Sequence, residues 1–230
     1  MIIFIGLFFM GLSWWVGSRL KSKFEEYSQT PIHSGMSGKE VAERMLRDNG
    51  IYDVRVESVE GHLSDHYNPA DKTVNLSPDV YHGRNAASTA VAAHECGHAV
   101  QHATNYTMLE VRSALVPLQN ASSTVMNIIV MMSIFGSYFL YHTFPIKWIL
   151  LIIIACNLVI TLFSLVTLPV EFDASRRALA WIEDKRIVTP DEHAMSKDAL
   201  KWAALTYVVA AVASISNLIY YVMMFMNSRD

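Results

Sequence analysis

Four long apolar stretches constrain what this chain can fold into more than any other feature of its sequence. Hydrophobic residues make up 52% of the 230 residues and charged residues only 17%, against about 25% charged in a typical soluble domain. A helix needs roughly 20 consecutive apolar residues to cross the hydrocarbon core of a bilayer. We therefore expect a mostly α-helical membrane protein. Its four transmembrane helices are predicted at residues 1–18, 121–141, 148–168 and 202–226.

The basic residues predict an orientation for these spans. Ten Lys and Arg residues lie between Arg19 and Arg112 and six lie between Arg176 and Lys201, whereas the rest of the chain holds only two. Loops on the cytoplasmic side carry the excess of Lys and Arg. We therefore expect the polar segments 19–120 and 169–201 to lie together in the cytoplasm, with both termini outside. The net charge of −3 argues against a general nucleic-acid binder.

The segment 19–120 is predicted to be an α+β region. Ser37 and Glu40 form a capping-box pattern that opens a helix ending near Asn49-Gly50. The valines between 54 and 59 indicate a strand, and residues 63–67 and 72–76 flank an Asn-Pro-Ala-Asp turn and predict a β-hairpin. The hairpin is either a plain structural ribbon or an edge that pairs with an extended substrate by strand addition. Ser77-Pro78 is predicted to start another short helix.

The alanine-rich segment 86–101 is predicted to form a helix, capped by Asn85 or Ser88. His94 and His98 are four residues apart, so they lie on the same helix face and can bind one zinc ion. Glu95 follows the first histidine, which gives the H-E-x-x-H arrangement of zinc hydrolases. The alternative is an exposed pair of histidines with no metal. Cys96 is two residues from each histidine and points away from that face, which favours a packing role.

A catalytic zinc site usually has three protein ligands and an open position for water. The third ligand must come from the same side of the membrane as the histidines. The predicted spans 121–141 and 148–168 form a hairpin that returns the chain to that side. Glu171 and Asp173 follow the third span directly, and both are candidates. Pro169 is expected to end that span and a new helix is expected to begin near Glu171.

Two sequence runs resemble the bacterial YugP-like membrane zinc metallopeptidases: Val91 to Gln101, which contains both histidines, and Leu168 to Ser175. The similarity extends to residues 65–69, 112–117 and 204–208 and so covers nearly the whole chain. It implies one zinc ion per chain, a zincin-like cytoplasmic region, a bacterial inner-membrane location and Glu171 as the third ligand. The Glu-Phe-x-Ala run at Glu171 is also similar to HtpX and CAAX-processing proteases, which have an aspartate where this chain has Ser175.

The expected function is therefore a zinc peptidase with Glu95 as general base, acting on a peptide or membrane-protein substrate at the cytoplasmic face. A second donor for the oxyanion is expected. Its candidates by residue type are His66, Arg112, His193 and Tyr207.

Two alternatives remain. An intramembrane protease would bury its metal helix in lipid, but the polar run from Gln101 to Asn105 makes that costly. A non-enzymatic zinc-binding scaffold or adaptor would not need Glu95, and structural zinc sites are usually closed by four ligands.

Overall fold

A computed structural model of the chain describes residues 2–61, 64–136 and 143–227. The chain divides into two compact units. The first comprises residues 1–13, 111–168 and 207–230, and the second comprises residues 14–110 and 169–206.

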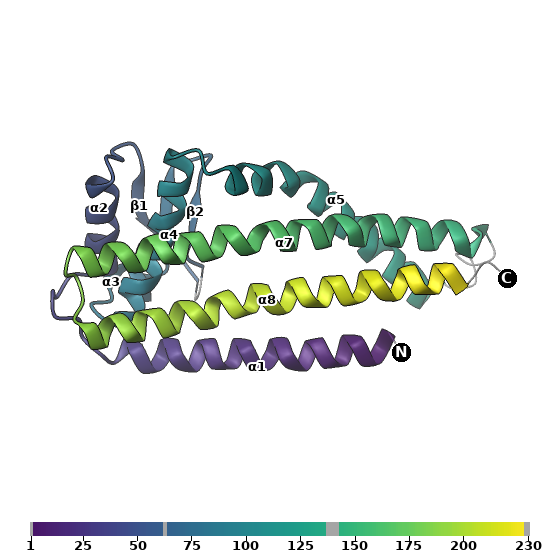
Figure 1. Ribbon diagram of the computed structural model, residues 1–230, viewed down its shortest axis with the longest axis horizontal. Coiled ribbons are helices and arrows are strands. Elements are labelled where there is room, and N and C mark those ends of the chain that lie inside the picture. The colour runs from purple at the N-terminus through teal and green to yellow at the C-terminus, as the bar shows by residue number, and fades with distance from the viewer. Residues whose placement is uncertain (1, 62–63, 137–142, 228–230) are drawn as a thin grey trace. The chain divides into compact units, whose positions relative to one another are not determined.

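The described residues are mostly helical and include four long helices (Figure 1). These are α1 (Ile2–Ser28), α5 (Thr107–Phe135), α7 (Ile146–Asp184) and α8 (Pro190–Asn227). Each is long and apolar enough to cross a membrane, which confirms the expected helical class and the four candidate spans. Residue 1 and residues 137–141 of the predicted spans lie outside the described residues.

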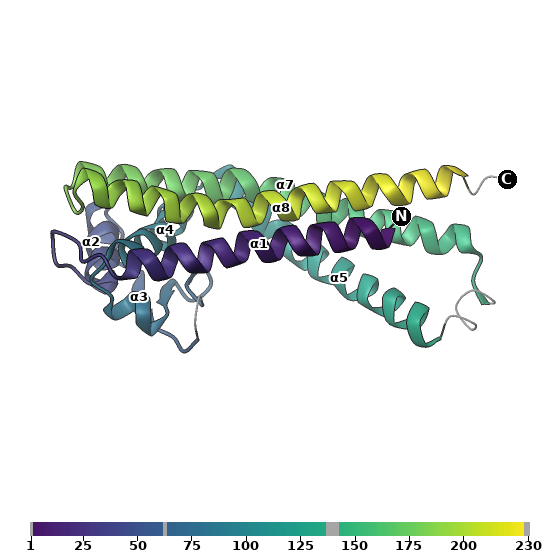
Figure 2. The ribbon, with the colours of Figure 1, turned by 90° about the horizontal axis from the view of Figure 1, so that it is seen from below.

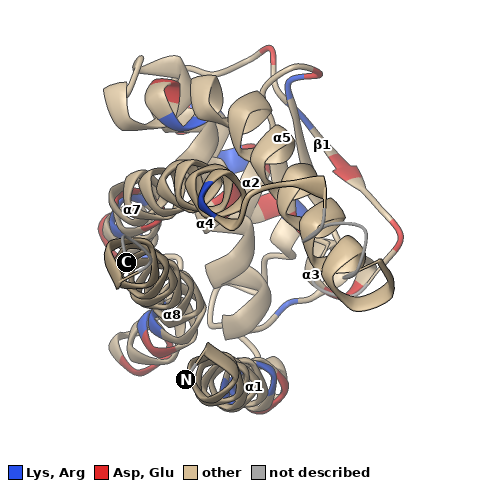
Figure 3. Cartoon of the chain, turned by 90° about the vertical axis from the view of Figure 1, so that its right-hand side faces the viewer, with Lys and Arg blue, Asp and Glu red and all other residues tan. Residues whose placement is uncertain are grey.

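The first unit has the composition of a lipid-facing helical bundle. Its described residues include only two charged side chains, Arg112 and Lys147, and uncharged ribbon predominates along α7 and α8 (Figure 3). Ile149 and Ile153 form a small buried cluster, while large apolar side chains such as Phe135 are exposed. Exposed apolar side chains on a long helix are what a surrounding bilayer accommodates.

The expectation that a new helix begins near Glu171 was wrong. Helix α7 continues without a break from Ile146 to Asp184, with Pro169 in its interior. Proline removes one intrahelical hydrogen bond, and helices of this length and hydropathy tolerate that loss because neighbouring groups satisfy the freed backbone. No new helix begins at Glu171. Glu171 and Asp173 are therefore two residues apart on one continuous helix and point to different faces.

The second unit contains the α+β region. Its short elements are α2 (Gly38–Asp48), β1 (Arg55–Ser58), β2 (His66–Asn68), β3 (Thr73–Leu76) and α3 (Pro78–His82). The Ser37–Glu40 capping box of α2 is present as predicted.

The hairpin is also confirmed, because β2 pairs antiparallel with β3. Leu63, its predicted first residue, lies outside the described residues. Strand β1 pairs parallel with β3, which gives the strand order β1-β3-β2 and leaves β2 at an edge of the sheet.

Helix α4 (Ala86–Ala103) lies in the core of the second unit, beside the sheet and α2 (Figure 1). Asn85 caps it by accepting a hydrogen bond from the backbone N–H of Ser88. Small side chains let other elements approach this helix closely, which explains why an alanine-rich sequence forms the centre of the unit. Its alanines with almost no exposed surface are Ala86, Ala87, Ala90, Ala92, Ala93 and Ala99.

The ends of α1 and α8 that belong to the second unit lie side by side (Figures 1 and 2). The Tyr27 hydroxyl donates a hydrogen bond to Asp198 over 2.7 Å. Trp15 and Trp202 meet edge to face, with ring centroids 5.6 Å apart. Aromatic pairs favour this geometry because the positive edge of one ring meets the negative face of the other.

Candidate metal centre

The two histidines of α4 and the first acidic residue after Pro169 lie together within the second unit. The Nε2 atom of His94 is 3.3 Å from Glu171 Oε2, and that of His98 is 3.7 Å from the same oxygen. The three candidate ligand atoms all lie within 4.8 Å of one another. The side chains are 13%, 10% and 4% exposed for His94, His98 and Glu171 respectively.

This donor set fits a zinc ion. Two imidazole nitrogens and one carboxylate oxygen are the ligands of one class of catalytic zinc site, in which a fourth position stays open. Ligand atoms about 2.0–2.1 Å from a tetrahedral zinc lie roughly 3.3 Å from one another, and the His94–Glu171 separation is 3.3 Å. The other ligand atoms, which lie within 4.8 Å of one another, must move closer together to bind the ion.

The electrostatics of the site also favour a cation. Burial alone would lower the pKa of His98, but the contact with Glu171 and the negative charge of Glu95 outweigh it and raise that pKa above its ordinary value. The same two carboxylates stabilise any positive charge placed among these side chains, because Coulomb interactions are strong where water is excluded. A divalent ion supplies such a charge.

Close packing of two helices brings the ligands together. Gly97 on α4 faces Ala174 on α7, and a Cβ atom at position 97 would come within 2.6 Å of the Ala174 carbonyl oxygen. Only glycine permits this approach. It places the α4 histidines beside Glu171, one turn before Ala174 on α7.

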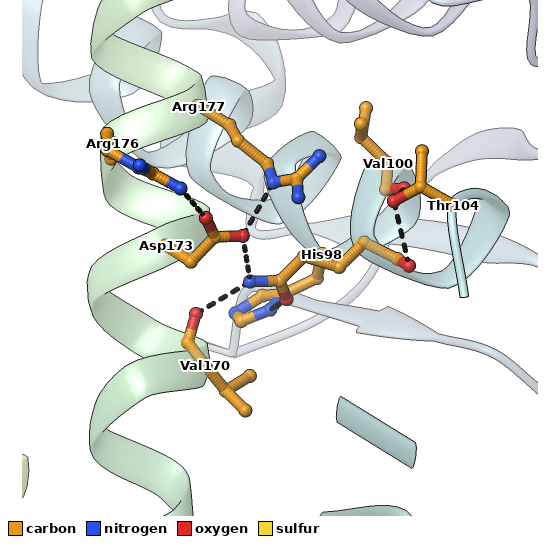
Figure 4. Close-up of polar contacts among 8 residues, drawn as sticks. His98, Val100, Thr104, Val170, Asp173, Arg176 and Arg177 are labelled. Atoms are coloured by element: carbon orange, nitrogen blue, oxygen red, sulfur yellow. Dashed lines mark hydrogen bonds and ion pairs between the residues drawn. The ribbon is translucent and has the colours of Figure 1, made fainter. Parts of the chain in front are cut away.

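His98, which Figure 4 shows beside Asp173 and Val170 of α7, has a buried polar partner on its own helix. Its Nδ1 atom is 3.0 Å from the side-chain oxygen of Gln101, and Gln101 is fully buried. The Gln101 amide nitrogen donates to the Val170 carbonyl and to Asp173. Asp173, the rival ligand candidate, is thus directed to Gln101 and not to the histidine Nε2 atoms.

His94 has a different partner. Its Nδ1 atom is 3.1 Å from the hydroxyl of Ser175 on α7. Ser175 therefore contacts His94 from the position at which the HtpX and CAAX-processing proteases have aspartate. Partners of this kind orient a ligating imidazole and tune its basicity, and a hydroxyl does so more weakly than a carboxylate.

Glu95 is 8% exposed and contacts the edge strand. Its carboxylate accepts a hydrogen bond of 3.0 Å from the backbone N–H of Tyr67 on β2. The Tyr67 hydroxyl lies 2.7 Å from Nδ1 of His102, one turn beyond His98 on α4. Strand β2 is therefore attached to the metal helix at two points through a single residue.

Of the four candidates for a second oxyanion donor, the two in the second unit have other partners. His66 is exposed and contacts the Ser64 carbonyl and Asn75. His193 lies on α8, 3.8 Å from Glu183. Arg112 and Tyr207 belong to the first unit and stay candidates from sequence alone.

Cys96 is fully buried and contacts the Ala42 carbonyl, in keeping with a packing role. Burial raises the pKa of its thiol well above the ordinary value. A thiol that resists ionisation is a poor metal ligand, because the thiolate is the form that binds metal.

Two features of the site were missed from the sequence. Gln101 follows His98 by three residues, and this spacing places both side chains on one helix face, so a local signal was present. The role of Tyr67 had no such signal, because the contact uses its backbone N–H and depends on where β2 lies in the fold.

Comparisons with known proteins identify the family of the chain. The sequence profile of a family described as "Putative neutral zinc metallopeptidase" matches residues 1–226. The chain is 41% identical over 230 residues to "Putative membrane protease YugP" of Bacillus subtilis (strain 168), covering 100% of this chain and 99% of that protein. No solved structure matches the chain significantly. The resemblance noted from the sequence is confirmed: the chain belongs to the family described as "Putative neutral zinc metallopeptidase".

Proposed function

We propose that this protein is a membrane-embedded zinc-dependent peptidase that hydrolyses peptide bonds at the cytoplasmic face of the bacterial inner membrane. The observation that carries the proposal is the cluster of His94, His98 and Glu171, whose ligand atoms lie within 4.8 Å of one another. Glu95 adds a carboxylate beside this cluster. A site that served only to hold a structural zinc would not need that carboxylate, and four protein ligands usually close such a site.

Each side chain has a defined role in this reaction. His94, His98 and Glu171 would hold the ion. When bound, zinc supplies a Lewis acid that lowers the pKa of water to about 7 and polarises a carbonyl group. Glu95 accepts a proton from the attacking water as its oxygen bonds to the peptide carbonyl carbon. Glu95 then gives this proton to the leaving amine as the C–N bond breaks.

The edge strand supports a peptide as the substrate. Within the described residues, β2 pairs only with β3, and its Tyr67 N–H is directed at Glu95. An extended peptide that adds to the outer edge of β2 would lie beside the general base and would compete with Glu95 for the Tyr67 N–H. We therefore propose strand addition at β2 as the binding mode, which favours extended or locally unfolded segments over helical ones.

The orientation rests on the basic residues. Sixteen of the 18 Lys and Arg residues lie in the segments 19–112 and 176–201, and cytoplasmic segments carry such an excess. The candidate metal site is built from residues of the second unit, to which most of these basic residues belong.

Membrane proteomics tests the proposal in cells. Cells that carry the Glu95→Gln variant should accumulate full-length membrane proteins or peptides that wild-type cells cleave. Glu95→Asp is a useful companion, because it retains a carboxylate on a shorter side chain. If the proteomes of wild-type and Glu95→Gln cells are the same, the peptidase proposal is contradicted and a zinc-binding scaffold is favoured.

A further inference from the structure

We propose that Gln101 and Asp173 form a positioning relay that fixes the ring of His98 for metal binding. Asp173 then acts through Gln101 and is not itself a metal ligand. This inference rests on the proposed zinc site. It does not depend on whether the protein cleaves peptides.

The first step concerns the orientation of the Gln101 amide. Its Nε2 atom is 2.8 Å from the Val170 carbonyl oxygen and 3.0 Å from Asp173 Oδ2. A carbonyl and a carboxylate can only accept hydrogen bonds. The amide therefore cannot be turned over, because its oxygen would then face two acceptors in a fully buried position.

The second step follows from this orientation. With Nε2 committed to α7, the Gln101 oxygen faces His98 Nδ1 at 3.0 Å. An amide oxygen only accepts, so Nδ1 of His98 must carry the proton. The lone pair of the neutral ring is then on Nε2, which is the atom directed at Glu171. A metal-ligating histidine commonly has its tautomer fixed in this way by the hydrogen bond of its other nitrogen.

The third step concerns what holds Asp173 in place. Its side chain is 5% exposed and pairs with Arg176 and with Arg177 Nε, the latter at 2.5 Å (Figure 4). Arg177 in turn lies over the ring of Tyr106, 5.7 Å from the centroid. The two cations fix the position of the carboxylate, and a charged acceptor forms a stronger hydrogen bond with Gln101 than a neutral one does.

The relay also joins the two helices of the site. His98 and Gln101 belong to α4, whereas Val170, Asp173 and Glu171 belong to α7. The buried Gln101 amide thus orients His98, a candidate ligand on α4, and bonds to the backbone of α7, which carries the candidate ligand Glu171. When every hydrogen bond of a buried polar group is satisfied, the packing around that group is fixed in a single arrangement. A buried group with unsatisfied hydrogen bonds does not fix the packing in this way.

Zinc affinity of the purified full-length protein, measured by competition with a chelator, tests the relay without any peptide substrate. Gln101→Met removes the acceptor and the donor while keeping the side chain long. We expect it to weaken zinc binding by about 10- to 100-fold, the usual effect of losing a partner of this kind. The absorption spectrum of the Co²⁺-substituted protein should change as well, because it reports the geometry of the ligands.

Ser196→Ala is the matched control. Ser196 is fully buried, and its single hydroxyl proton is shared between the Glu192 carbonyl at 3.0 Å and the Ala86 carbonyl at 3.4 Å. The second contact joins the other end of α4 to α8. Its loss should lower the melting temperature and leave zinc affinity unchanged. If Gln101→Met behaves in the same way, Gln101 has a merely structural role and the relay is overturned.

A reciprocal pair of substitutions tests the relay if Gln101→Met does not fold. Gln101→Glu keeps an acceptor for His98 but sets a second carboxylate against Asp173, and it should weaken zinc binding. Adding Asp173→Asn supplies an amide that can donate to the new carboxylate. Zinc affinity should then recover in part, because the Val170 carbonyl still faces that carboxylate. A double variant that binds zinc no better than Gln101→Glu alone would overturn the proposal. Zinc binding by a wild-type protein that cleaves no peptide would contradict the peptidase and leave the relay standing.

Discussion

Gly97 of α4 and Ala174 of α7 are in such close contact that a Cβ atom at position 97 would lie 2.6 Å from the Ala174 carbonyl oxygen. This contact lies between the two histidines in sequence and three residues after Glu171. It therefore controls the distance between the two helices that carry the candidate ligands.

Gly97→Ala is expected to push α4 away from α7. Overpacking of a tight interface typically costs about 1–3 kcal/mol, and zinc affinity should fall along with the melting temperature. Gly17→Ala is the matched control, because a Cβ atom added to Gly17 in α1 would meet no atom within 4 Å, and alanine favours a helix over glycine. An alanine at position 97 with unchanged stability and zinc affinity would contradict the role given to this contact.

Ser175→Asp is expected to strengthen zinc binding. The Ser175 hydroxyl contacts Nδ1 of His94, and a carboxylate in its place would form a stronger, charge-assisted hydrogen bond that makes the imidazole a more basic ligand. Ser175→Ala should weaken binding, by up to about 10-fold. Chelator competition on the purified variants measures both effects. The account of Ser175 is wrong if the aspartate and alanine variants have equal zinc affinities.

Tyr67 variants separate the two contacts between β2 and α4. Tyr67→Phe removes the hydroxyl that faces His102 but keeps the backbone N–H at Glu95. Tyr67→Pro removes the N–H that donates to Glu95, on a strand that lies at an edge of the sheet. We expect Tyr67→Pro to raise KM for extended peptides far more than Tyr67→Phe does. Equal kinetics for the two variants would argue against strand addition at this residue.

The orientation of the chain can be checked by cysteine labelling. Thr104→Cys places a thiol at the exposed end of α4, and Phe144→Cys places one between the second and third spans. The two native cysteines are buried, which keeps the background low. A membrane-impermeant maleimide should label position 144 in intact spheroplasts and position 104 only after the membrane is opened, following the distribution of Lys and Arg. The reverse pattern would place the candidate site outside the cytoplasm.

Local signals predicted much of the fold. The hairpin could be predicted because the Asn-Pro-Ala-Asp turn after Tyr67 encodes its own geometry: Asn68 accepts hydrogen bonds from the N–H groups of Ala70 and Asp71. The parallel pairing of β1 with β3 has no local signal, because the two strands are far apart in sequence.

The expected helix start at Glu171 and the choice between Glu171 and Asp173 could not be settled from local signals either. The local chemistry of Pro169 predicts a helix end, yet α7 continues through it. Asp173 was a reasonable rival ligand while a new helix was expected at Glu171. On one continuous helix, residues two apart do not share a face, and Asp173 lies against Gln101 and two arginines. That network forms only when α4 and α7 come together, so no short stretch of sequence reveals it.

The third ligand can be tested through metal content alone. Glu171→Ala removes the carboxylate that faces both histidines, and a zinc ion held by two protein ligands instead of three should dissociate readily. We expect purified Glu171→Ala to lose zinc on dialysis under conditions in which wild type retains it. Asp173→Ala should retain more zinc than Glu171→Ala, because Asp173 acts only through Gln101. The opposite order would make Asp173 the ligand.

The most direct test of the central claim compares purified wild-type protein with Glu95→Gln for both zinc content and cleavage of an unfolded casein-like substrate. We predict that both proteins hold one zinc ion per chain. Cleavage by the variant should fall by about 10²- to 10⁴-fold, the usual contribution of a general acid–base group. Cleavage by Glu95→Gln at the wild-type rate, with zinc bound, would contradict the assignment of Glu95 as the general base.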